Sequence, residues 1–382
     1  MAGGANGTEK RLVRPQRKRV TLADVAAKAG VSVATASVAI TGRPSGNCRV
    51  SAEVAERIRA AARALNYRPN IQARSLSTQR THTIAMLIKR AAWHNAMSYV
   101  SAMQRLLRKA GYTEMFMLHP DNLLETEREQ LEMCIQRRVE GIVTLPLIDL
   151  DGRANVELLN QIQQEEGIPI VQLGLALDGC VAPSIVADDV EGMRSAVRLL
   201  HAMGHRNIAY VTIAGFDNTN TLNPFRQAHL RYLGYRKGLD ELGLAEAVFC
   251  GRGDCTEVEF LYDRGFEVAK AFAAAVNGAG NTRRPTAAIT FSDFTAAGLV
   301  AGLLDAGIKV PDQVSVLGVG DQPFARMLRP ALSTLAPPFE RMGELATQTL
   351  LKMIDGGGAG ESAAIPPSLV MRDTVRAIEA GT

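Results

Sequence analysis

The feature that most limits the fold of this chain is an alternation of short apolar segments with amphipathic helical segments, which starts at Thr83. Such an alternation predicts βαβ units, whose strands form a parallel sheet with helices on both faces. The expected strands cover residues 84–88, 114–118, 141–145, 169–173, 208–212, 287–291 and 315–319. The expected helices cover residues 97–109, 127–137, 156–165, 192–203, 230–242, 294–306 and 342–354.

The alternation stops and starts again after Asp188, which predicts two doubly wound lobes in tandem with a cleft between them. In open α/β sheets, ligands bind beyond the carboxyl ends of the strands. Trp93, the only tryptophan, either stacks on a sugar face there or lies half-buried in the core. The candidate ligand residues that this rule selects are Lys89, Arg90, Trp93, Asp188, Asp189, Asp293 and Asp321.

A purely helical pattern precedes the alternating one, between residues 20 and 42. Thr21 has the position of a helix N-cap, with an acidic residue three positions later. Gly30 supplies a turn, because glycine adopts a left-handed backbone at little cost, and Ser32 caps a second short helix. The pattern predicts a helix-turn-helix, whose second helix lies in the DNA major groove, although its spacing also fits a structural helical hairpin.

The charge distribution favours the DNA-binding interpretation. Residues 1–80 carry 15 Lys and Arg residues against four acidic ones, a net charge of +11. The whole chain has 43 basic and 39 acidic residues, so residues 81–382 carry a net charge of −7. A basic head on an acidic body is typical of a nucleic-acid-binding module tethered to a second domain.

Other classes of protein lack support in the sequence. There is no run of eighteen apolar residues for a membrane span, and the N-terminus lacks the apolar segment of a secretory signal. The motifs GxSxG, the Walker lysine loop and GxGxxG after a strand are absent, so we expect neither an enzyme nor a cofactor. His201 and His205 have the spacing of a zinc pair but no third ligand follows, so no metal site is expected.

The cysteines support a reducing compartment. They are odd in number, scattered and never spaced as CxxC, which predicts reduced, mostly structural thiols in a cytoplasmic protein. The five are Cys48, Cys134, Cys180, Cys250 and Cys255. For a DNA-binding protein, the expected location is nucleoid-associated.

The N-terminal residues resemble the start of the LacI/GalR (lactose-repressor-type) family of transcriptional regulators. The resemblance lies in TLADVAAKAGVS followed by TASVAITG and in the run LNYRPNIQARSL at residues 65–76, and similar motifs continue along nearly the whole chain. It implies an α/β fold with an N-terminal all-α helix-turn-helix domain and a two-lobed, periplasmic-binding-protein-like core of doubly wound parallel sheets. It also implies a repressor that a small molecule, a sugar or sugar derivative, switches in the cleft between the lobes.

The resemblance and the composition divide the chain as follows. A basic flexible leader is expected at 1–19, the helix-turn-helix domain at 20–68, a hinge helix and linker at 69–81, and the effector-binding core at 82–378. The first lobe is expected at about 82–185 and 332–355, and the second at about 186–331 and 356–378.

In the family, the hinge folds into a short helix on operator DNA and inserts a leucine into the minor groove. Carried onto this chain, that leucine is Leu76, with Ala73 on the same face and Arg74 beside it. An apolar side chain that partly unstacks a base step kinks the duplex, and so short a helix needs the DNA to form. An ordinary linker is the alternative. The expected DNA-binding residues are Thr21, Leu22, Ser32, Val33, Ala34, Thr35, Ser37, Val38, Arg49, Asn70, Ala73, Arg74 and Leu76.

Two departures from the family pattern bear on specificity. Where the family has Thr-Val-Ser-Arg in its DNA-reading helix, this chain has Thr35-Ala-Ser-Val38, so the arginine that forks onto guanine is missing. We expect this helix to recognise thymine methyl groups and DNA shape, with Thr35 and Ser37 on phosphates. Where the family has Gly-aromatic-Asp-Asp, this chain has Gly318-Val-Gly-Asp321, so the carboxylate that often contacts a sugar hydroxyl is missing.

Two ligand residues come from family motifs. Arg231 begins the R-x-x-G-aromatic string RYLGY, whose arginine holds the effector in the family, and its guanidinium can bind hydroxyls or a carboxylate bidentately. Asp293 matches the aspartate of an Asn-Asp pair in which serine replaces the asparagine.

The expected partners are double-stranded operator DNA, a small-molecule effector and a second copy of the chain. A homodimer matches a pseudo-palindromic operator, and no leucine-heptad tail follows Arg376 to form a tetramer. The alternative function is a solute-binding protein for sugar sensing or transport, which shares the core. It predicts a secretion signal and no basic head, and the sequence shows the opposite.

Overall fold

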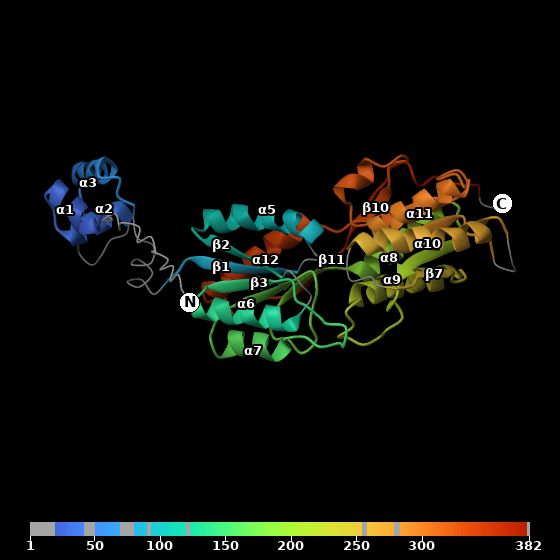
Figure 1. Cartoon of the computed structure of the whole chain (residues 1–382), viewed down its shortest axis with the longest axis horizontal. Coiled ribbons are helices and arrows are strands. Elements are labelled where there is room, and N and C mark those ends of the chain that lie inside the picture. The colour runs from blue at the N-terminus through green and yellow to red at the C-terminus, as the bar shows by residue number, and fades with distance from the viewer. Residues whose placement is uncertain are drawn as a thin grey trace, which may run out of the picture. The chain divides into compact units, whose positions relative to one another are not determined.

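The computed structural model describes residues 20–41, 50–68, 80–89, 93–119, 123–253, 258–278 and 283–379 (Figure 1). The chain divides into two compact units, Met1–Thr81 and His82–Thr382. Among the described residues, no single helix is long and apolar enough to cross a membrane. The helices Leu22–Ala29 and Val33–Ile40 are long and apolar enough for a membrane span only when they are counted together, and a bend of 102° separates them.

The first unit contains α1 (Leu22–Ala29), α2 (Val33–Thr41) and α3 (Ala52–Ala64). Thr21 and the side chain of Asp24 form a reciprocal capping box at the start of α1, and Gly30 ends that helix with φ +63°. Ser32 accepts a hydrogen bond from Thr35 N–H, as expected for an N-cap. The core that these helices share consists mostly of alanine side chains, namely Ala26, Ala29, Ala36, Ala39, Ala55 and Ala61, together with Val25 and Ile58.

The first lobe of the second unit is a fully parallel sheet in the order β11-β5-β4-β3-β1-β2. Helices α5 (Trp93–Lys109) and α12 (Phe339–Ile354) share one hydrophobic cluster with the sheet. Helices α6 (Leu124–Gln136) and α7 (Val156–Gln164) share another. The strands are β1 (Thr83–Lys89), β2 (Thr113–His119), β3 (Gly141–Thr144), β4 (Ile170–Leu173), β5 (Ser184–Ala187) and β11 (Ala363–Ile365).

The second lobe repeats this winding in the order β12-β10-β9-β8-β6-β7, with β12 antiparallel to β10 at the edge. Helices α8 (Asp189–Ala202) and α9 (Arg226–Leu242) share one cluster with the sheet. Helices α10 (Val258–Val276) and α11 (Asp293–Asp305) share the other. The strands are β6 (Ile208–Ile213), β7 (Val248–Gly251), β8 (Ala287–Thr290), β9 (Ser315–Val319), β10 (Ser333–Ala336) and β12 (Ser368–Val370).

The architecture confirms the predicted doubly wound lobes, but it corrects where the chain crosses between them. Strand β10, which we expected in the first lobe, pairs with β9 in the second. Strand β11, which we expected in the second lobe, pairs with β5 in the first. Short strands carry the same apolar pattern whichever sheet they join, so the sequence does not show which sheet takes β10 and which takes β11. The sequence analysis also missed β7, which forms one edge of the second sheet, and α10, which packs with α11 on one of its faces.

Helices α10 and α11 pack with backbone against backbone. A Cβ atom placed on Gly298 of α11 would lie 2.0 Å from the carbonyl oxygen of Tyr262 in α10. A Cβ atom on Gly265 of α10 would lie 2.1 Å from the carbonyl oxygen of Thr295 in α11. Only glycine at these two positions permits so close an approach.

Candidate functional site

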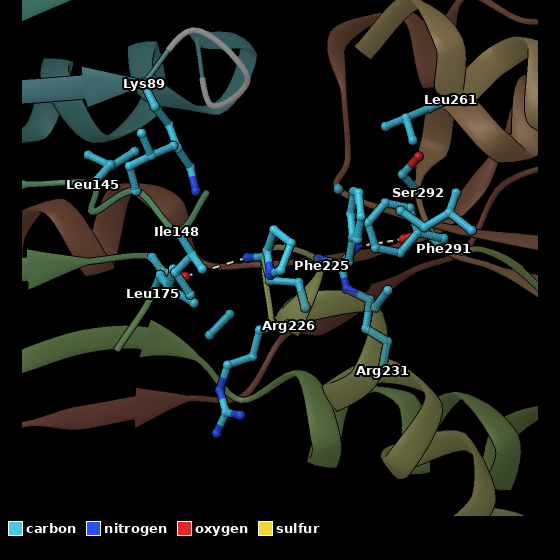
Figure 2. Close-up of a pocket in the computed structure, with 18 of the residues that line it drawn as sticks. Lys89, Leu145, Ile148, Leu175, Phe225, Arg226, Arg231, Leu261, Phe291 and Ser292 are labelled. Atoms are coloured by element: carbon cyan, nitrogen blue, oxygen red, sulfur yellow. Dashed lines mark hydrogen bonds between the residues drawn. The ribbon is translucent and has the colours of Figure 1, made fainter. Parts of the chain in front are cut away.

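The site in the second unit lies where the winding of each sheet reverses. Strand β1 lies between β2 and β3, and β6 lies between β7 and β8. Loops that leave neighbouring strands toward opposite faces open a crevice at their carboxyl ends. Lys89, the last residue of β1, and Ile213, the last residue of β6, both line a pocket of about 610 Å³ between the lobes (Figure 2).

The walls of this pocket are mainly apolar. Both lobes contribute aromatic rings and aliphatic side chains, including Tyr99, Leu145, Ile148, Leu175, Phe225, Leu261, Phe291, Phe294, Phe339 and Met342. The polar and charged lining residues are Lys89, Asp149, Asp151, Arg153, Arg226, Gln227, Arg231, Ser292 and Gln322. The size and the apolar character suit a small organic ligand that a few polar groups orient.

Arg231, predicted from the family motif, lines the pocket from α9 and is only 8% exposed. Its Nε donates to Asp189 Oδ1 at 2.8 Å, and its Nη1 donates to the carbonyl oxygen of Phe291 at 2.5 Å. The guanidinium also lies 5.0 Å from the centre of the Phe291 ring. Burial lowers the pKa of Arg231, but the charge of Asp189 and the hydrogen bond to it, together with the nearby Tyr210 and Asp293, outweigh burial, so the pKa is raised and the side chain stays a cation.

Lys89, selected by its position after the first strand, lines the pocket from the first lobe. Its Nζ donates to the carbonyl oxygen of Pro146 at 3.4 Å. Burial lowers the pKa of Lys89, and the charge of Glu127 opposes this shift. Glu127 is 1% exposed and accepts hydrogen bonds from the Leu147 N–H and the Asn155 amide, at 3.1 and 2.9 Å.

The structure does not bring the predicted carboxylates of Asp188, Asp293 and Asp321 to the pocket lining. Asp188 caps α8 by accepting from Glu191 N–H, and Asp321 pairs with Arg372 at 2.5 Å. Both carboxylates are therefore engaged by other groups of the protein. Asp189 lies beneath the wall, where it holds Arg231.

Asp293 is fully buried at the start of α11. Its carboxylate oxygens accept from the Thr334 hydroxyl at 2.6 Å and from Gln322 N–H at 2.7 Å. Gly318 makes room for it, since a Cβ there would lie 2.3 Å from Asp293 Oδ1. Burial raises the pKa of Asp293 to about 6, although the hydrogen bond from Thr334 lowers it.

This raised pKa predicts a pH-dependent stability. The folded chain holds the Asp293 proton more tightly than the unfolded chain, whose pKa is near 3.8. Acidification from pH 7 to pH 4.5 is therefore expected to increase the contribution of Asp293 to the free energy of unfolding by about 2 kcal/mol, and the full gain of about 3 kcal/mol is reached only below pH 3.8. The measurement is urea unfolding across this range for the chain and for Asp293→Asn, whose amide still accepts from Gln322 and donates to Thr334. Parallel pH profiles of the two proteins would contradict the assignment.

The pocket also contains residues that the sequence analysis missed. Phe291 lay within a predicted strand, and the structure places it just beyond β8, at the predicted edge. Phe225 and Phe339 come from segments without a distinguishing pattern, and only the folding of both lobes brings them together. Arg90 lies outside the described residues, as does the side chain of Trp93, the first residue of α5.

The candidate DNA-binding surface is the N-terminal half of α2 in the first unit. Val33 is 49% exposed and Ala34 is exposed, so these apolar side chains face outward. Val38 is only 8% exposed, which corrects its expected place on the DNA-reading face, because it lies among the buried positions of α2. The residues Arg49, Asn70, Ala73, Arg74 and Leu76 lie outside the described residues.

The remaining predicted DNA-binding residues of the head shape its turns and caps. Thr21 is exposed, and Leu22 packs against the helical core. The hydroxyls of Ser32 and Thr35 lie 2.8 Å apart, and Ser37 is half-buried.

The basic residues of α3 are engaged within the head. Arg59 and Arg63 pair with Glu56, and Arg57 Nε donates to the carbonyl oxygen of Ala29 at the end of α1 at 3.2 Å. Helix α3 therefore supports the other two helices of the first unit.

The histidine pair noted in the sequence has a structural setting. His205 is 1% exposed, and its ring nitrogens lie 2.9 Å from Thr286 Oγ1 and 3.1 Å from the carbonyl oxygen of Arg376. Burial lowers the pKa of His205. Within the described part of the chain, no group of three or more His, Cys, Asp or Glu residues is placed to hold a metal ion.

Comparisons with known proteins agree with both units. Residues 21–70 match the family model "Bacterial regulatory proteins, lacI family", and residues 197–375 match "Periplasmic binding protein-like domain". The HTH-type transcriptional repressor PurR of Vibrio campbellii is 29% identical over 358 residues, which cover 93% of this chain and 98% of that protein. PurR of Pectobacterium atrosepticum is 29% identical over 335 residues, which cover 87% and 90%.

A solved structure extends the comparison to the three-dimensional fold. The lac repressor dimer bound to operator and the anti-inducer ONPF matches with a TM-score of 0.75 and 25% identity, over 94% of this chain and 100% of that one. The capped helix-turn-helix and the two-lobed core thus occur together in similar proteins. Residues 21–70 thus match the lacI family of bacterial regulatory proteins, and the chain is similar along nearly its whole length to transcriptional repressors of that family, which are not enzymes.

Proposed function

We propose that this chain is a repressor that binds a pseudo-palindromic operator as a homodimer, and that a small molecule in the pocket between the lobes controls this binding. The observation that carries the proposal is the capped helix-turn-helix at α1 and α2, joined in one chain to a core with a ligand-sized pocket. The lac repressor structure, a dimer on its operator, supports the dimer and the DNA partner.

The coupling needs only that the ligand binds one arrangement of the lobes more tightly than another. The pocket is lined from both lobes, so a bound ligand contacts both. A change in their arrangement then alters how well two chains place their heads on the two half-sites. The hinge residues Asn70, Ala73, Arg74 and Leu76 are part of this proposal, as is a cytoplasmic location.

The family resemblance implies that the effector is a sugar or sugar derivative. The support for a sugar is the resemblance itself, whereas the lining of this pocket has few neutral hydrogen-bonding side chains. The alternative of a solute-binding transport protein is not favoured, because residues 21–70 match a family of regulatory proteins.

The test is selection of DNA fragments by the full-length chain, followed by binding measurements at several salt concentrations. We expect selected half-sites to contain A·T pairs opposite the exposed Val33 and Ala34, with no guanine that a recognition-helix arginine would require. Affinity should fall steeply with salt as phosphate counterions are released. A particle mass of two chains is expected in solution.

A matched pair of variants isolates the head. Ala34→Glu places a carboxylate on the exposed face of α2 and is expected to abolish specific binding. Ala274→Glu makes the same change at an exposed position of α10 and is expected to leave DNA binding intact. A chain that shows no salt-sensitive preference for any fragment, or an Ala34→Glu variant that binds normally, would contradict the proposal.

A further inference from the structure

The chemical class of the effector can be inferred from the charges that line the pocket, and this inference rests on the proposed function of that pocket. A neutral sugar offers many hydroxyls and needs many uncharged donors and acceptors around it. Among the described lining residues, the neutral side chains with hydrogen-bonding groups are Tyr99, Gln227, Ser292 and Gln322. Ser292 caps α11, and Gln227 donates to the carbonyl oxygen of Gly174 at 3.4 Å, so two of these side chains already have structural partners.

The carboxylates of the lining are also engaged. Arg153 donates to Asp149 at 2.9 Å and to Asp151 at 2.8 Å, and its own N–H donates to Asp149 Oδ1 at 2.8 Å. A ligand hydroxyl would have to compete with this arginine for either aspartate. The anions of the pocket are therefore balanced within the protein.

The ammonium group of Lys89 has fewer hydrogen bonds within the described residues than these carboxylates have together. An ammonium group has three donors, and the hydrogen bond that the described residues give Lys89 Nζ is the long one to Pro146. Glu127 acts on Lys89 through its charge, but its oxygens accept from Leu147 and Asn155 instead. Figure 2 shows the Lys89 nitrogen pointing from the end of β1 into the space between the lobes.

The wall opposite Lys89 is apolar and aromatic. Phe225, Phe291 and Leu261 line the pocket from the second lobe, and Leu145 and Ile148 line it from the first (Figure 2). The nearby cation Arg231 is already neutralised by Asp189, and it stacks on Phe291. The aromatic and aliphatic side chains among these residues can pack against a flat apolar ligand but offer it no side-chain hydrogen bonds.

We propose that the effector is a small aromatic carboxylate, whose carboxylate pairs with Lys89 and whose ring packs against Phe225 and Phe291. Such a ligand contacts the first lobe through its charge and the second through its ring. It therefore favours one arrangement of the lobes, which is the differential affinity that control of DNA binding requires.

The test measures thermal unfolding of the full-length chain with benzoate, 4-hydroxybenzoate and phenylacetate at constant ionic strength. Glucose, ribose and benzamide, the neutral analogue of benzoate, are the comparison probes. We expect a saturable rise in melting temperature with at least one acid and none with benzamide or the sugars. A rise with sugars and not with acids would overturn the assignment and leave the proposed function standing, as would equal rises with benzamide and benzoate.

Variants of Lys89 test whether its ammonium group binds the carboxylate of the ligand. Lys89→Met is expected to weaken binding of the active acid roughly 10–100-fold, because it removes a charge-assisted hydrogen bond, and Lys89→Arg is expected to retain most of the affinity. Lys270→Met, at an exposed position of α10, is the matched control and should bind the acid normally. Normal binding by Lys89→Met, or no response to any of the acids, would overturn the inference.

A separate measurement distinguishes this inference from the proposed function. Operator binding is measured with and without the acid that shifts the melting temperature. A change in operator affinity supports both. Acid binding that depends on Lys89 without any change in operator affinity would support the ligand class and contradict the proposed control of DNA binding.

Discussion

Replacing Arg231 with methionine is expected to lower the free energy of unfolding of the core by about 3–5 kcal/mol. The substitution leaves the carboxylate of Asp189, whose side chain is 4% exposed, without its partner. It also removes the donor to the carbonyl oxygen of Phe291. A buried charge that loses its counter-ion costs far more than the pair itself contributes. The measurement is urea unfolding followed by circular dichroism at neutral pH.

Two further variants identify the cause of this loss. Arg231→Met combined with Asp189→Asn removes both charges, so we expect it to recover a large part of the stability that the single change loses. Arg105→Met breaks an exposed ion pair with Glu340 and Glu344 and is expected to cost less than about 1 kcal/mol. If Arg231→Met were as mild as Arg105→Met, the Arg231–Asp189 pair would not be a desolvated contact.

Replacing Gly298 with valine is expected to destabilise the second lobe by about 3 kcal/mol, the upper end of the usual cost of overpacking. The new Cβ would lie 2.0 Å from the carbonyl oxygen of Tyr262 and 2.8 Å from the backbone nitrogen of Phe266. Both are backbone atoms of α10, so no side-chain rotation relieves the overlap and the two helices must move apart. Thermal unfolding of the full chain measures the loss.

The matched control for Gly298→Val is Ala274→Val on the exposed face of α10. It also introduces valine into a helix, but it meets no backbone, so its cost is expected to stay near the helix-propensity difference of about 0.5 kcal/mol. An equal loss of stability in both variants would show that helix propensity, rather than the close approach of α10 and α11, is responsible.

The elements that the sequence predicted well are those whose signals are local. The capping box at Thr21 and Asp24, the left-handed Gly30 and the strand Ser315–Val319 all appear where the pattern placed them. Caps, turns and continuous apolar runs depend on neighbouring residues, so they are visible in one sequence. Lys89 and Arg231 were likewise found by position and motif, and both line the pocket. Their role in binding a ligand stays a prediction.

The features that the sequence did not predict depend on contacts between distant segments of the chain. Asp293 and Asp321 have the sequence context of ligand residues, yet Thr334 and Arg372, far along the chain, engage their carboxylates. Val38 occupies a position expected to read DNA and is buried instead.

The sequence by itself therefore determined the class of the protein: a basic helix-turn-helix head, an alternating α/β core and a site at the ends of the strands. Periodicity, caps and charge are properties of short segments, so they can be recognised in the sequence without the tertiary structure. The tertiary structure alone decided which sheet contains β10 and which contains β11, which aromatic rings line the pocket, and which charged side chains pair with one another. Those outcomes depend on burial and on pairing between residues far apart in the chain, and such contacts cannot be inferred from local sequence patterns.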